Sequence, residues 1–526
     1  MSELLRFDGV DIGNGKTIVQ QLSLTLNEGE RLGLVGESGS GKTLSALGIA
    51  GLLPGNLRIS SGHITIRLPD APIRFPDASR SDIQRLRRHA LGFVFQEPMS
   101  ALNPVKSCGW QLAENIQMTR SLSKSQLKKE VLHWMKEVEL PNPERIEHAF
   151  PHQLSGGQRQ RLMIAMALCN HPKLLIADEP TTALDVRVRD VVLDLIEQLC
   201  ERYNTALLLI SHDLKMVAKR CDHIAVLKNG ILCEYGTARE VLKNPQHSYT
   251  KALWACRPDP MNRIIPLPSV KDIESNRSLT RRIYNNEQWL EVAKEKQNHP
   301  PILSANNLRF AYGDTEVLKG ITFNLYPGEA LGILGESGCG KSTLSRIISG
   351  LENLQDGYLT ISDESGLRVD LASQPRQWRA ERIQMIFQDA MAALNPSHTI
   401  GRTLSDVRRH FFPRESQAER GRVISDTLEN MGLSADAVKR YPHAFSGGQR
   451  QRICIARALL AEPKILICDE SVAALDVSVQ AQILNLLTQI RDEKGMSFIF
   501  ISHDPDTVRY FCHRVLEMEK GVFVNT

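Results

Sequence analysis

The sequence predicts an α/β protein built from two copies of one domain, each with a largely parallel β-sheet. Apolar segments of strand length, such as residues 31–35, 174–177 and 206–210, alternate with helix-like patterns. A glycine-rich loop follows the first of these segments and leads into a helix that starts after Lys42. The same order of segments and loops returns in the second half of the chain, which indicates a duplicated domain.

Internal repetition defines the domain organisation. Three pairs of matching residues are each separated by 291 positions: Ser155 and Ser446, Asp178 and Asp469, and His212 and His503. The lysines of the two glycine-rich loops, Lys42 and Lys341, are separated by 299 positions. The halves therefore share one architecture, with length differences in the loops that precede the serine. We expect a first domain over residues 1–256 and a second over residues 301–526.

Residues 257–300 are expected to link the two domains. Prolines at positions 258, 260, 266 and 268 precede a polar run over residues 271–299, a composition typical of a linker. We expect a short helix around residues 287–296. If extended, the segment could span a considerable distance.

The gross composition excludes several classes of protein. A length of 526 residues indicates two or more domains, and 42% hydrophobic and 24% charged residues are ordinary for a globular protein. The net charge of +4 argues against a dedicated nucleic-acid binder. No apolar run approaches the roughly 18 residues that span a bilayer, and the start has no signal-peptide layout. The ten cysteines form no Cys-x-x-Cys pair, so we expect neither zinc nor a disulfide framework.

An eight-residue sequence that contains Ser-Gly-Gly-Gln occurs at residues 154–161 and almost unchanged at residues 445–452. The serine stands where a helix N-cap is expected, and the glycines leave the first backbone N–H groups accessible. Such a helix start attracts phosphate. A single copy would equally be explained as a helix-opening turn, but two copies among other phosphate motifs favour a nucleotide contact. The predicted contact residues are Ser155, Gly156, Gly157 and Gln158 in the first half, and Ser446, Gly447, Gly448 and Gln449 in the second.

Both glycine-rich loops fit the phosphate-loop pattern, because each follows an apolar strand and precedes a helix. Their backbone N–H groups would surround a polyphosphate, with the lysines on the β and γ phosphates and the hydroxyls of Thr43 and Ser342 on Mg²⁺. The alternative, a glycine-rich turn without a ligand, does not explain the full pattern occurring twice. The first loop comprises Gly36, Glu37, Ser38, Gly39, Ser40, Gly41, Lys42 and Thr43; the second comprises Gly335, Glu336, Ser337, Gly338, Cys339, Gly340, Lys341, Ser342 and Thr343.

Four further kinds of side chain follow apolar strands in each half. Asp178 and Asp469 are placed to hold Mg²⁺, and the adjacent Glu179 and Glu470 to polarise an attacking water. Taken alone, an acidic pair usually belongs to a solvated loop. A glutamine after a strand usually marks only a polar strand end, and a lone histidine usually has a structural role. The common order in both halves favours the functional interpretation. It also predicts that Gln96 and Gln388 complete the Mg²⁺ or water shell, and that His212 and His503 contact the γ-phosphate.

In this order the chain resembles a tandem ATP-binding subunit of an ABC transporter. The Walker A loop, the Gln loop, the L-S-G-G-Q signature, the Walker B pair, the Ala-Leu-Asp motif (residues 183–185 and 474–476) and the His loop all occur twice. The resemblance covers nearly everything outside the linker. It implies two P-loop ATPase domains, each with a mostly parallel core sheet, an antiparallel sheet and a helical subdomain.

Finer features are similar to the oligopeptide/dipeptide/nickel importer subfamily. They are the Gln-loop stretches at residues 95–104 and 387–396, and the segment at residues 244–253. The first half is similar to the D-type ATPase of such systems and the second to the F-type, here fused. The resemblance implies two transmembrane permease subunits that bind near the Gln loops, a substrate-binding protein, and a peripheral location on the cytoplasmic face of the inner membrane.

The family resemblance implies that the halves pair head to tail within one chain, with two ATP molecules and Mg²⁺ at their interface. The first-half phosphate loop would then share one ATP with the signature at Ser446, and the second-half loop would share the other with Ser155. Hydrolysis at both sites would drive the permease between its two states.

The chain departs from the family pattern at several positions. Tyr312 is placed to stack on adenine, whereas residues 12–14 in the first half carry no aromatic, so we expect weaker nucleotide binding there. Ser471 replaces a proline after the second acidic pair, but Glu470 remains. The second half ends without the segment found at residues 244–253. Only Cys256 lies where some relatives carry an iron–sulfur cluster, so we expect no cluster.

Two other classes of function remain as alternatives. One is a tandem ATPase acting on ribosomes or DNA, which the missing charged helical pair, zinc cysteines and coiled coil disfavour. The other is an exporter, which the Gln-loop resemblance disfavours. The cargo cannot be read from the sequence, since peptides, nickel and metal–metallophore complexes all fit.

Overall fold

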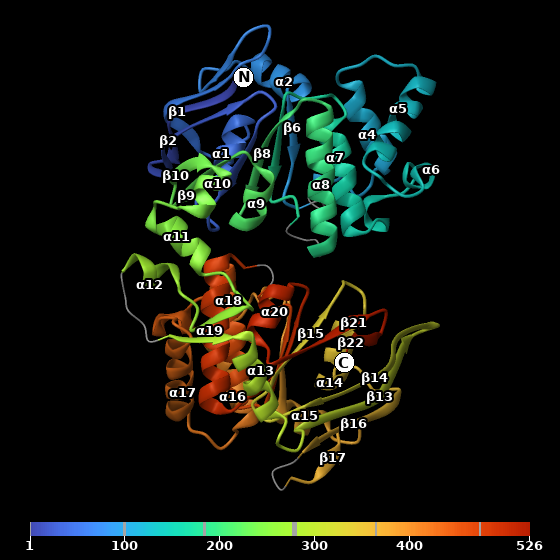
Figure 1. Ribbon diagram of the computed structural model, residues 1–526, viewed down its shortest axis with the longest axis vertical. Helices are drawn as coiled ribbons and strands as arrows, with labels where there is room; N and C mark the ends of the chain where they lie inside the picture. Colours follow the sequence, from blue (N-terminus) through green and yellow to red (C-terminus); the bar gives the residue numbers. More distant parts are fainter. Residues whose placement is uncertain are drawn as a thin grey trace. The chain divides into compact units, whose positions relative to one another are not determined.

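The computed structural model describes residues 2–97, 101–181, 186–275, 281–362, 366–472 and 475–525. The chain divides into two compact units. The first unit contains Met1–Trp254 and Ile273–Asn276, and the second contains Ala255–Asp272 and Arg277–Thr526. Each unit combines a parallel sheet, an antiparallel sheet and a group of helices (Figure 1), which confirms the predicted fold class.

The first unit contains ten strands in one sheet, in the order β5-β4-β1-β2-β10-β9-β3-β8-β7-β6. Strands β9, β3, β8, β7 and β6 are parallel, whereas β5, β4, β1 and β2 are antiparallel. The strands are β1 (Glu3–Asn14), β2 (Lys16–Asn27), β3 (Arg31–Val35), β4 (Arg58–Ile66), β5 (Ile73–Phe75), β6 (Leu91–Val94), β7 (Leu174–Asp178), β8 (Ala206–Ser211), β9 (His223–Lys228) and β10 (Ile231–Thr237).

The helices of the first unit surround the parallel strands and form a separate group. In Figure 1, α4, α5 and α6 lie together on the side away from β1 and β2. The helices are α1 (Lys42–Ile49), α2 (Arg80–His89), α4 (Cys108–Gln117), α5 (Lys124–Glu137), α6 (Pro143–Ile146), α7 (Gly156–Leu168), α8 (Val186–Arg202), α9 (Leu214–Arg220), α10 (Ala238–Lys243) and α11 (Ser248–Ala255).

The second unit repeats this plan with two sheets. The parallel sheet has the order β18-β19-β20-β15-β21-β22, with β22 antiparallel, and the antiparallel sheet has the order β14-β13-β16-β17. The elements are β13 (Leu303–Tyr312), β14 (Thr315–Leu325), β15 (Ala330–Gly335), α14 (Lys341–Ser349), β16 (Asp356–Ser362), β17 (Arg368–Asp370), α15 (Arg376–Arg382), β18 (Ile383–Ile386), α16 (Ile400–Phe411), α17 (Gln417–Asn430), α18 (Gly447–Leu459), β19 (Ile465–Asp469), α19 (Val477–Lys494), β20 (Ser497–Ser502), α20 (Pro505–Phe511), β21 (Arg514–Glu519) and β22 (Val522–Asn525).

The central parallel strands form where the sequence is continuously apolar. Every residue of β7, β8, β19 and β20 is buried, as expected for strands covered on both faces. Each unit has its own hydrophobic core, which joins the strands to α1 in the first unit and to α14 in the second. Polar side chains at the carboxyl ends of these strands are thereby held by a rigid layer.

The segment expected to be a linker is folded over most of its described length. It contains β11 (Asn262–Ile265), α12 (Val270–Glu274), β12 (Arg282–Asn285) and α13 (Asn286–Lys296), and β11 pairs with β12. The helix predicted around residues 287–296 is confirmed. Trp289 is 3% exposed and stacks on His513 with ring centroids 5.0 Å apart. Apart from Ile273–Asn276, the segment therefore packs as part of the second unit.

Polar contacts also join this segment to the second unit. Arg263 and Trp289 of the segment donate to the carbonyls of Arg509 at 2.7 Å and Cys512 at 2.8 Å. Tyr510 donates in the opposite direction, to the carbonyl of Ile264 at 2.6 Å. The side chain of Asn485 accepts from the N–H of Leu267 at 2.7 Å and donates to the carbonyl of the same residue at 2.9 Å.

The surface that receives this segment is chemically different in the two halves. In the first unit, Arg220 forms ion pairs with three carboxylates of α8: Asp190, Asp194 and Glu197. The matching positions in the second unit, found by the constant separation of 291 residues, hold Phe511, Ala481, Asn485 and Thr488. The exchange of Asp194 for Asn485 supplies the side-chain amide that bonds both backbone groups of Leu267 in the segment.

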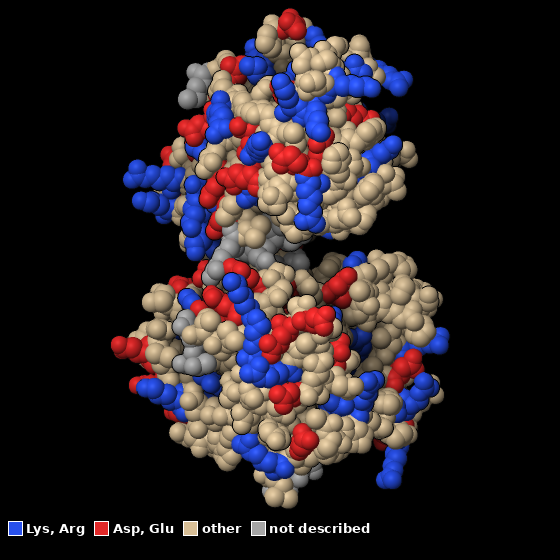
Figure 2. All heavy atoms as spheres, turned by 90° about the vertical axis from the view of Figure 1, so that its right-hand side faces the viewer, with Lys and Arg blue, Asp and Glu red and all other residues tan. Residues whose placement is uncertain are grey.

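Charged side chains are mixed over the surface. On the face shown in Figure 2, lysines and arginines are interspersed with aspartates and glutamates on both units. None of the helices in the described part of the chain is long and apolar enough to cross a membrane.

Candidate functional site

The first phosphate loop connects β3 to α1 and needs its glycines. Gly39 and Gly41 have φ of 80° and 98°, a region that side chains disfavour. A Cβ on Gly36 would lie 2.2 Å from the carbonyl oxygen of Leu227. The Lys42 ammonium donates to the carbonyls of Gly36 at 2.7 Å and Glu37 at 2.9 Å. The loop therefore curls around its own lysine.

The second phosphate loop, between β15 and α14, has the same geometry. Gly338 and Gly340 have φ of 78° and 113°. The Lys341 ammonium donates to the carbonyls of Gly335 at 2.8 Å and Glu336 at 2.7 Å. Cys339 takes the place of Ser40, and burial raises the pKa of its thiol. Both loops thus place a lysine where it can meet phosphate oxygens.

Each acidic pair lies at the carboxyl end of a buried strand. Asp178 is 3% exposed and ends β7, and Asp469 is 6% exposed and ends β19. Burial raises the pKa of both carboxyls. Hydrogen bonds from Thr43 to Asp178 and from Ser342 to Asp469 lower it, but less than burial raises it. The Oγ of Ser342 donates to Asp469 at 3.4 Å. The strand end and the phosphate loop therefore meet in each unit.

These residues fit a magnesium ion. The Oδ1 atom of Asp178 is buried without a hydrogen-bond partner, which is costly unless the atom serves a ligand. Carboxylate and hydroxyl oxygens beside a phosphate-binding loop are the donors that Mg²⁺ prefers. Four of the six predicted metal ligands, Thr43, Asp178, Ser342 and Asp469, are thus chemically suited to the ion. The other two, Gln96 and Gln388, donate their amides to Glu179 and Glu470 in this structure.

The glutamates of the acidic pairs are held by partners from two other strands. Gln96 donates to Glu179 at 3.0 Å, and the Nδ1 atom of His212 lies 3.4 Å from the other carboxylate oxygen. In the second unit, Gln388 donates to Glu470 at 2.7 Å and His503 lies 3.4 Å away.

Both glutamates have left-handed backbone conformations, with φ of 44° at Glu179 and 49° at Glu470. Non-glycine residues in this region carry strain of about 1–3 kcal/mol, which is frequent at functional sites. The imidazole of His503, 3.4 Å from the carboxylate, lowers the pKa of Glu470. An ionised carboxylate at this position can accept a proton from water.

The signature serines begin α7 and α18 as expected. Ser155 accepts from the N–H of Gln158, whose side chain in turn accepts from the N–H of Ser155, and Ser446 and Gln449 repeat this capping box. The glycines of each signature form the first turn of the helix. The described contacts of these side chains lie within their own helix, so the structure does not bring them to the phosphate loop of the same unit.

The predicted adenine platform differs between the halves. Tyr312 ends β13, is 45% exposed and meets Phe310 edge to face at 4.8 Å. In the first unit, Ile12 is buried, and a Cβ on Gly13 would lie 2.4 Å from the carbonyl oxygen of Lys16. The tight β1–β2 hairpin thus has no room for an aromatic side chain at Gly13.

Two residues near the site were missed by the sequence analysis. Ser345, one helical turn after Ser342, donates to Asp469 at 3.3 Å, and its i+3 spacing in the helix could have indicated this. The hydroxyl of Tyr249 accepts from the N–H of Glu37 in the phosphate loop at 3.3 Å. Tyr249 belongs to the segment at residues 244–253, which resembles the importer subfamily. The sequence alone assigns no structural role to this segment.

Some expectations fall outside the described residues. They are the Ala-Leu-Asp motif at residues 183–185, the start of its second copy at residue 474, and residues 98–100 of the first Gln-loop stretch. Among the described residues no group of three or more His, Cys, Asp or Glu side chains is arranged to hold a metal ion. The described cysteines form no disulfide.

Comparison with known proteins identifies the same two regions. The sequence family described as "ABC transporter" matches residues 19–182 and 318–473. The chain is 38% identical over 520 residues to "Glutathione import ATP-binding protein GsiA" of Shigella sonnei and of Escherichia coli strain K12, covering 96% of this chain and 82% of each relative. The protein of that name from Pectobacterium atrosepticum is 38% identical over 535 residues, covering 97% and 83%.

Proposed function

Because the chain belongs to the ABC transporter family of ATP-binding proteins, we propose that it is the ATP-hydrolysing subunit of an importer that takes up peptides, nickel or metal–metallophore complexes. The observation that carries the proposal is the 38% identity over 96% of the chain to relatives named for glutathione import. Glutathione is itself a short peptide, which supports a peptide-like cargo. The paired phosphate loops and acidic pairs supply the ATPase chemistry.

Two composite ATP sites are proposed, each formed by both halves. Lys42, Asp178, Glu179 and His212 would act with the signature at Ser446, and the matching second-half residues with the signature at Ser155. The signature serines are fixed at helix N-termini, where backbone N–H groups favour phosphate. Since their described contacts lie within their own helices, they are available to the nucleotide held by the other half.

Within each site the residues have distinct proposed roles. The lysine binds the β and γ phosphates, and Tyr312 stacks on the adenine of its site. Glu179 and Glu470 take a proton from the attacking water, and His212 and His503 orient the γ-phosphate. Gln96 and Gln388, which hydrogen-bond the glutamates, orient the water or complete the metal shell.

Mg²⁺ is proposed as the cofactor that accompanies ATP. Asp178 and Asp469 would hold it with the hydroxyls of Thr43 and Ser342, and with the amides of Gln96 and Gln388. When bound there, it would neutralise charge on the phosphates. Buried aspartates with raised pKa values gain most from such a counter-charge.

The proposed partners are two transmembrane permease subunits and a substrate-binding protein. The chain would lie peripherally on the cytoplasmic face of the inner membrane and contact the permease near its Gln loops. The alternatives, an exporter ATPase or a tandem ATPase acting on ribosomes or DNA, have less support, because the names of the similar proteins specify import.

The test is to purify the tagged chain from membranes and to identify what remains bound. We expect two permease proteins, and an ATPase rate that rises when a substrate-binding protein loaded with a short peptide or metal complex is added to the reconstituted transporter. Association with ribosomes or DNA and without a permease would contradict the proposal. A rate that rises with cargo inside the vesicle and without a binding protein would favour export.

A further inference from the structure

The helix that follows each signature serine is held at its far end by an arginine. In the first unit Arg120, which comes shortly after α4, donates to the carbonyl of Cys169 at 2.7 Å. In the second unit Arg408 of α16 donates to the carbonyl of Leu460 at 3.1 Å. Cys169 and Leu460 are the C-caps of α7 and α18, and they are separated by 291 positions, as the signature serines are. The same backbone carbonyl therefore receives a guanidinium in both halves.

The two arginines do not occupy matching positions in the sequence. Counted from the glutamines of the Gln loops, Arg408 corresponds to Ile116, and Arg120 corresponds to Phe412. Each half thus reaches the same carbonyl from a different place on the helices that precede the signature. Since a duplication alone would preserve the same residues, a contact made by different ones indicates a role for the contact itself.

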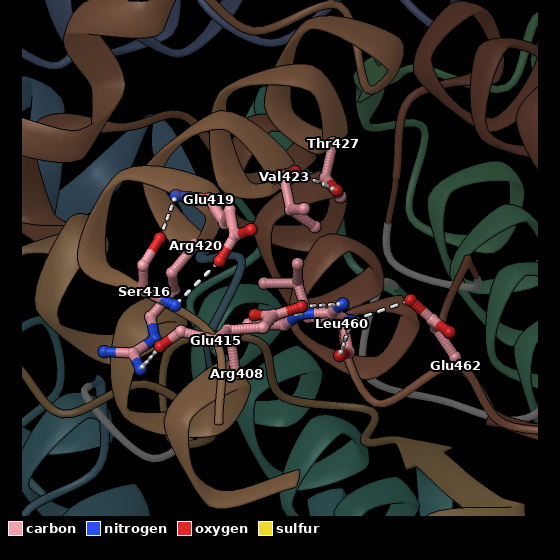
Figure 3. Close-up of polar contacts among 9 residues, drawn as sticks. All are labelled: Arg408, Glu415, Ser416, Glu419, Arg420, Val423, Thr427, Leu460 and Glu462. Carbon is pink, nitrogen blue, oxygen red and sulfur yellow. Dashed lines mark hydrogen bonds and ion pairs between the residues drawn. The ribbon is translucent and has the colours of Figure 1, made fainter. Parts of the chain in front are cut away.

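The contact of the second unit is ionic and buried. Arg408 is 5% exposed, and Figure 3 shows it between Glu415 and Glu462. It donates to Glu415 at 2.9 Å and to Glu462 at 2.8 Å, and its guanidinium lies 3.5 Å from the ring centroid of Phe412. Glu462 belongs to the short connection between α18 and β19. One side chain therefore joins α16, the end of α18 and the connection to β19.

The contact of the first unit is less buried and is supplemented by neutral hydrogen bonds. The side chain of Arg120 is 32% exposed and lies 3.4 Å from the carboxylate of Glu130. Asn170, which follows the C-cap of α7, donates to the carbonyl of Asn115 at 2.9 Å and accepts from the hydroxyl of Thr119 at 2.6 Å. Several bonds thus share the task of holding this end of α7.

The second half has no side-chain amide for this task. Ala461 stands at the position of Asn170, and an alanine side chain can form neither of the two neutral bonds. We therefore expect the end of α18 to depend more strongly on Arg408 than the end of α7 depends on Arg120.

The signature helices are also held close to their start. Arg161 donates to the carbonyl of Val138 at 2.8 Å, and Arg452 donates to the carbonyl of Met431 at 2.7 Å. Val138 and Met431 are the C-caps of α5 and α17. Each signature helix has 13 residues and is about 20 Å long. Because it is held near both ends, it cannot tilt without breaking one of these contacts.

We propose that Arg120 and Arg408 are positioning residues, which act through the signature helix to fix the serine at its start for catalysis. This inference rests on the proposed function, in which each signature serves the nucleotide of the other half. Arg408 then controls hydrolysis of the ATP held by Lys42, and Arg120 controls hydrolysis of the ATP held by Lys341.

The physical basis is the sensitivity of catalysis to small displacements. A misplacement of about 1 Å can slow a reaction about 10²-fold. Loss of the arginine removes the cation that is favourable at a helix C-terminus and frees that end of the helix. The helix can then pivot about the contact near its start, which moves the signature serine. The phosphate loop that holds the nucleotide is unchanged, so the effect falls on the rate and not on nucleotide affinity.

The experiment measures kcat and KM for ATP in the full-length chain, one site at a time. Glu470→Gln leaves the first-half site to hydrolyse, and Glu179→Gln leaves the second-half site. Arg408→Met should lower kcat about tenfold in the Glu470→Gln background and less than about twofold in the other. Arg120→Met should show the reverse pattern with a smaller loss, because the bonds of Asn170 remain. KM should change little in either case.

Matched variants separate positioning from loss of fold. Arg408→Lys keeps the charge, but one ammonium cannot reach the carbonyl and both carboxylates together, so its kcat should be intermediate. If Arg408→Met does not fold, this milder variant carries the test. Arg409→Met removes the neighbouring arginine of α16, which is 65% exposed and pairs with Asp406, and it should change neither kcat. The melting temperature and the affinity for ADP report the fold and the phosphate loops, and both should be retained.

Two outcomes would overturn the inference. In the first, Arg408→Met lowers kcat at the second-half site as much as at the first-half site, as a local structural role predicts. In the second, it changes neither kcat although Ser446→Ala lowers that of the first-half site. If Ser446→Ala itself leaves hydrolysis at the first-half site unchanged, the composite site of the proposed function fails, and the inference fails with it.

Discussion

The side-chain amide of Gln96 donates to the carboxylate of Glu179 at 3.0 Å, and Gln388 and Glu470 repeat this contact at 2.7 Å. Each pair joins the ends of two neighbouring strands, because β6 pairs with β7 and β18 with β19. The amide holds one carboxylate oxygen while a histidine lies beside the other. The orientation of each glutamate is therefore set by a glutamine and a histidine that follow the two strands flanking its own.

Replacing the glutamates should abolish hydrolysis and spare binding. We expect Glu179→Gln and Glu470→Gln each to slow hydrolysis at their own site by about 10²–10⁴-fold, since a neutral amide accepts a proton poorly. Equilibrium binding of ATP should change little. Single-turnover hydrolysis and filter binding measure the two effects, with Glu144→Gln as a surface control. A variant that loses binding and hydrolysis together would contradict the assigned role.

The two ATP sites should differ in affinity. In the proposed second-half site Tyr312, which is 45% exposed, would supply an aromatic face to the adenine, whereas Gly13 leaves no space for an aromatic side chain in the first half. We expect stronger ATP binding at the second-half site, and Tyr312→Ala should weaken it by about 1 kcal/mol or more. Titration calorimetry resolves the two sites, and Tyr358→Ala, at a 72% exposed tyrosine, is the control. Equal affinities in the wild-type chain would rule the difference out.

Tyr249 should affect the first site alone. Its hydroxyl accepts from the N–H of Glu37, so Tyr249→Phe leaves that partly buried donor without this partner. A lost hydrogen bond of this kind is worth about 0.5–1.5 kcal/mol, so we expect ATP binding at the first site to weaken about two- to tenfold. Tyr235→Phe, which removes a hydroxyl that donates to Thr25, is the matched control. Weakening at the second site would exclude a local effect.

Stability should depend on pH with opposite signs at two adjacent carboxyls. The pKa of Glu470 is lowered below 4.5 by the neighbouring His503, so its stabilising contribution is complete above that pH and is lost as pH falls through the lowered pKa. The pKa of Asp469 is raised above 3.8 by burial, so its ionised form costs stability at neutral pH and the cost disappears in acid.

Chemical unfolding in the presence of EDTA should separate these two carboxyls. At pH 7, Glu470→Gln should lower the free energy of unfolding and Asp469→Asn should raise it. Both differences should shrink as the pH approaches 3. Changes of the same sign at pH 7 would contradict the opposed pKa shifts.

The folded segment before the second half should contribute strongly to its stability. Trp289→Ala removes a buried indole and its hydrogen bond to Cys512, so we expect a loss of about 3–5 kcal/mol in the unfolding of the second unit. Trp110→Ala, at a 45% exposed site in the first unit, should cost less than about 1 kcal/mol. Urea unfolding followed by hydrogen exchange assigns each change to its unit. Similar losses for the two variants would show that the segment is only loosely attached.

Much of the fold could be predicted from sequence because the informative patterns are local. The apolar run at residues 31–35 matches β3 to the residue, and the runs at residues 174–177 and 206–210 each fall one residue short of their strands. The N-cap role predicted for the signature serine is also a local property, and it is confirmed at Ser155 and Ser446.

The features that the sequence did not reveal depend on contacts between distant residues. Proline-rich composition indicates a linker, but the contacts of this segment with Arg509, Tyr510 and Asn485 are visible only in three dimensions. The bond from Tyr249 to the phosphate loop joins residues 212 positions apart, which no local pattern predicts. The family resemblance implies that Gln96, Glu179 and His212 belong to one site, but it does not predict the direct hydrogen bond between Gln96 and Glu179.

The contacts of Asn485 give the duplicated chain a direction. Its side-chain amide bonds both backbone groups of Leu267 in the segment before the second half. The matching residue of the first half, Asp194, is an ion-pair partner of Arg220, and a carboxylate there could accept from an N–H group but could not donate to a carbonyl. A chain with its halves transposed would therefore lose this clasp, and the two copies are no longer exchangeable neighbours of the segment between them.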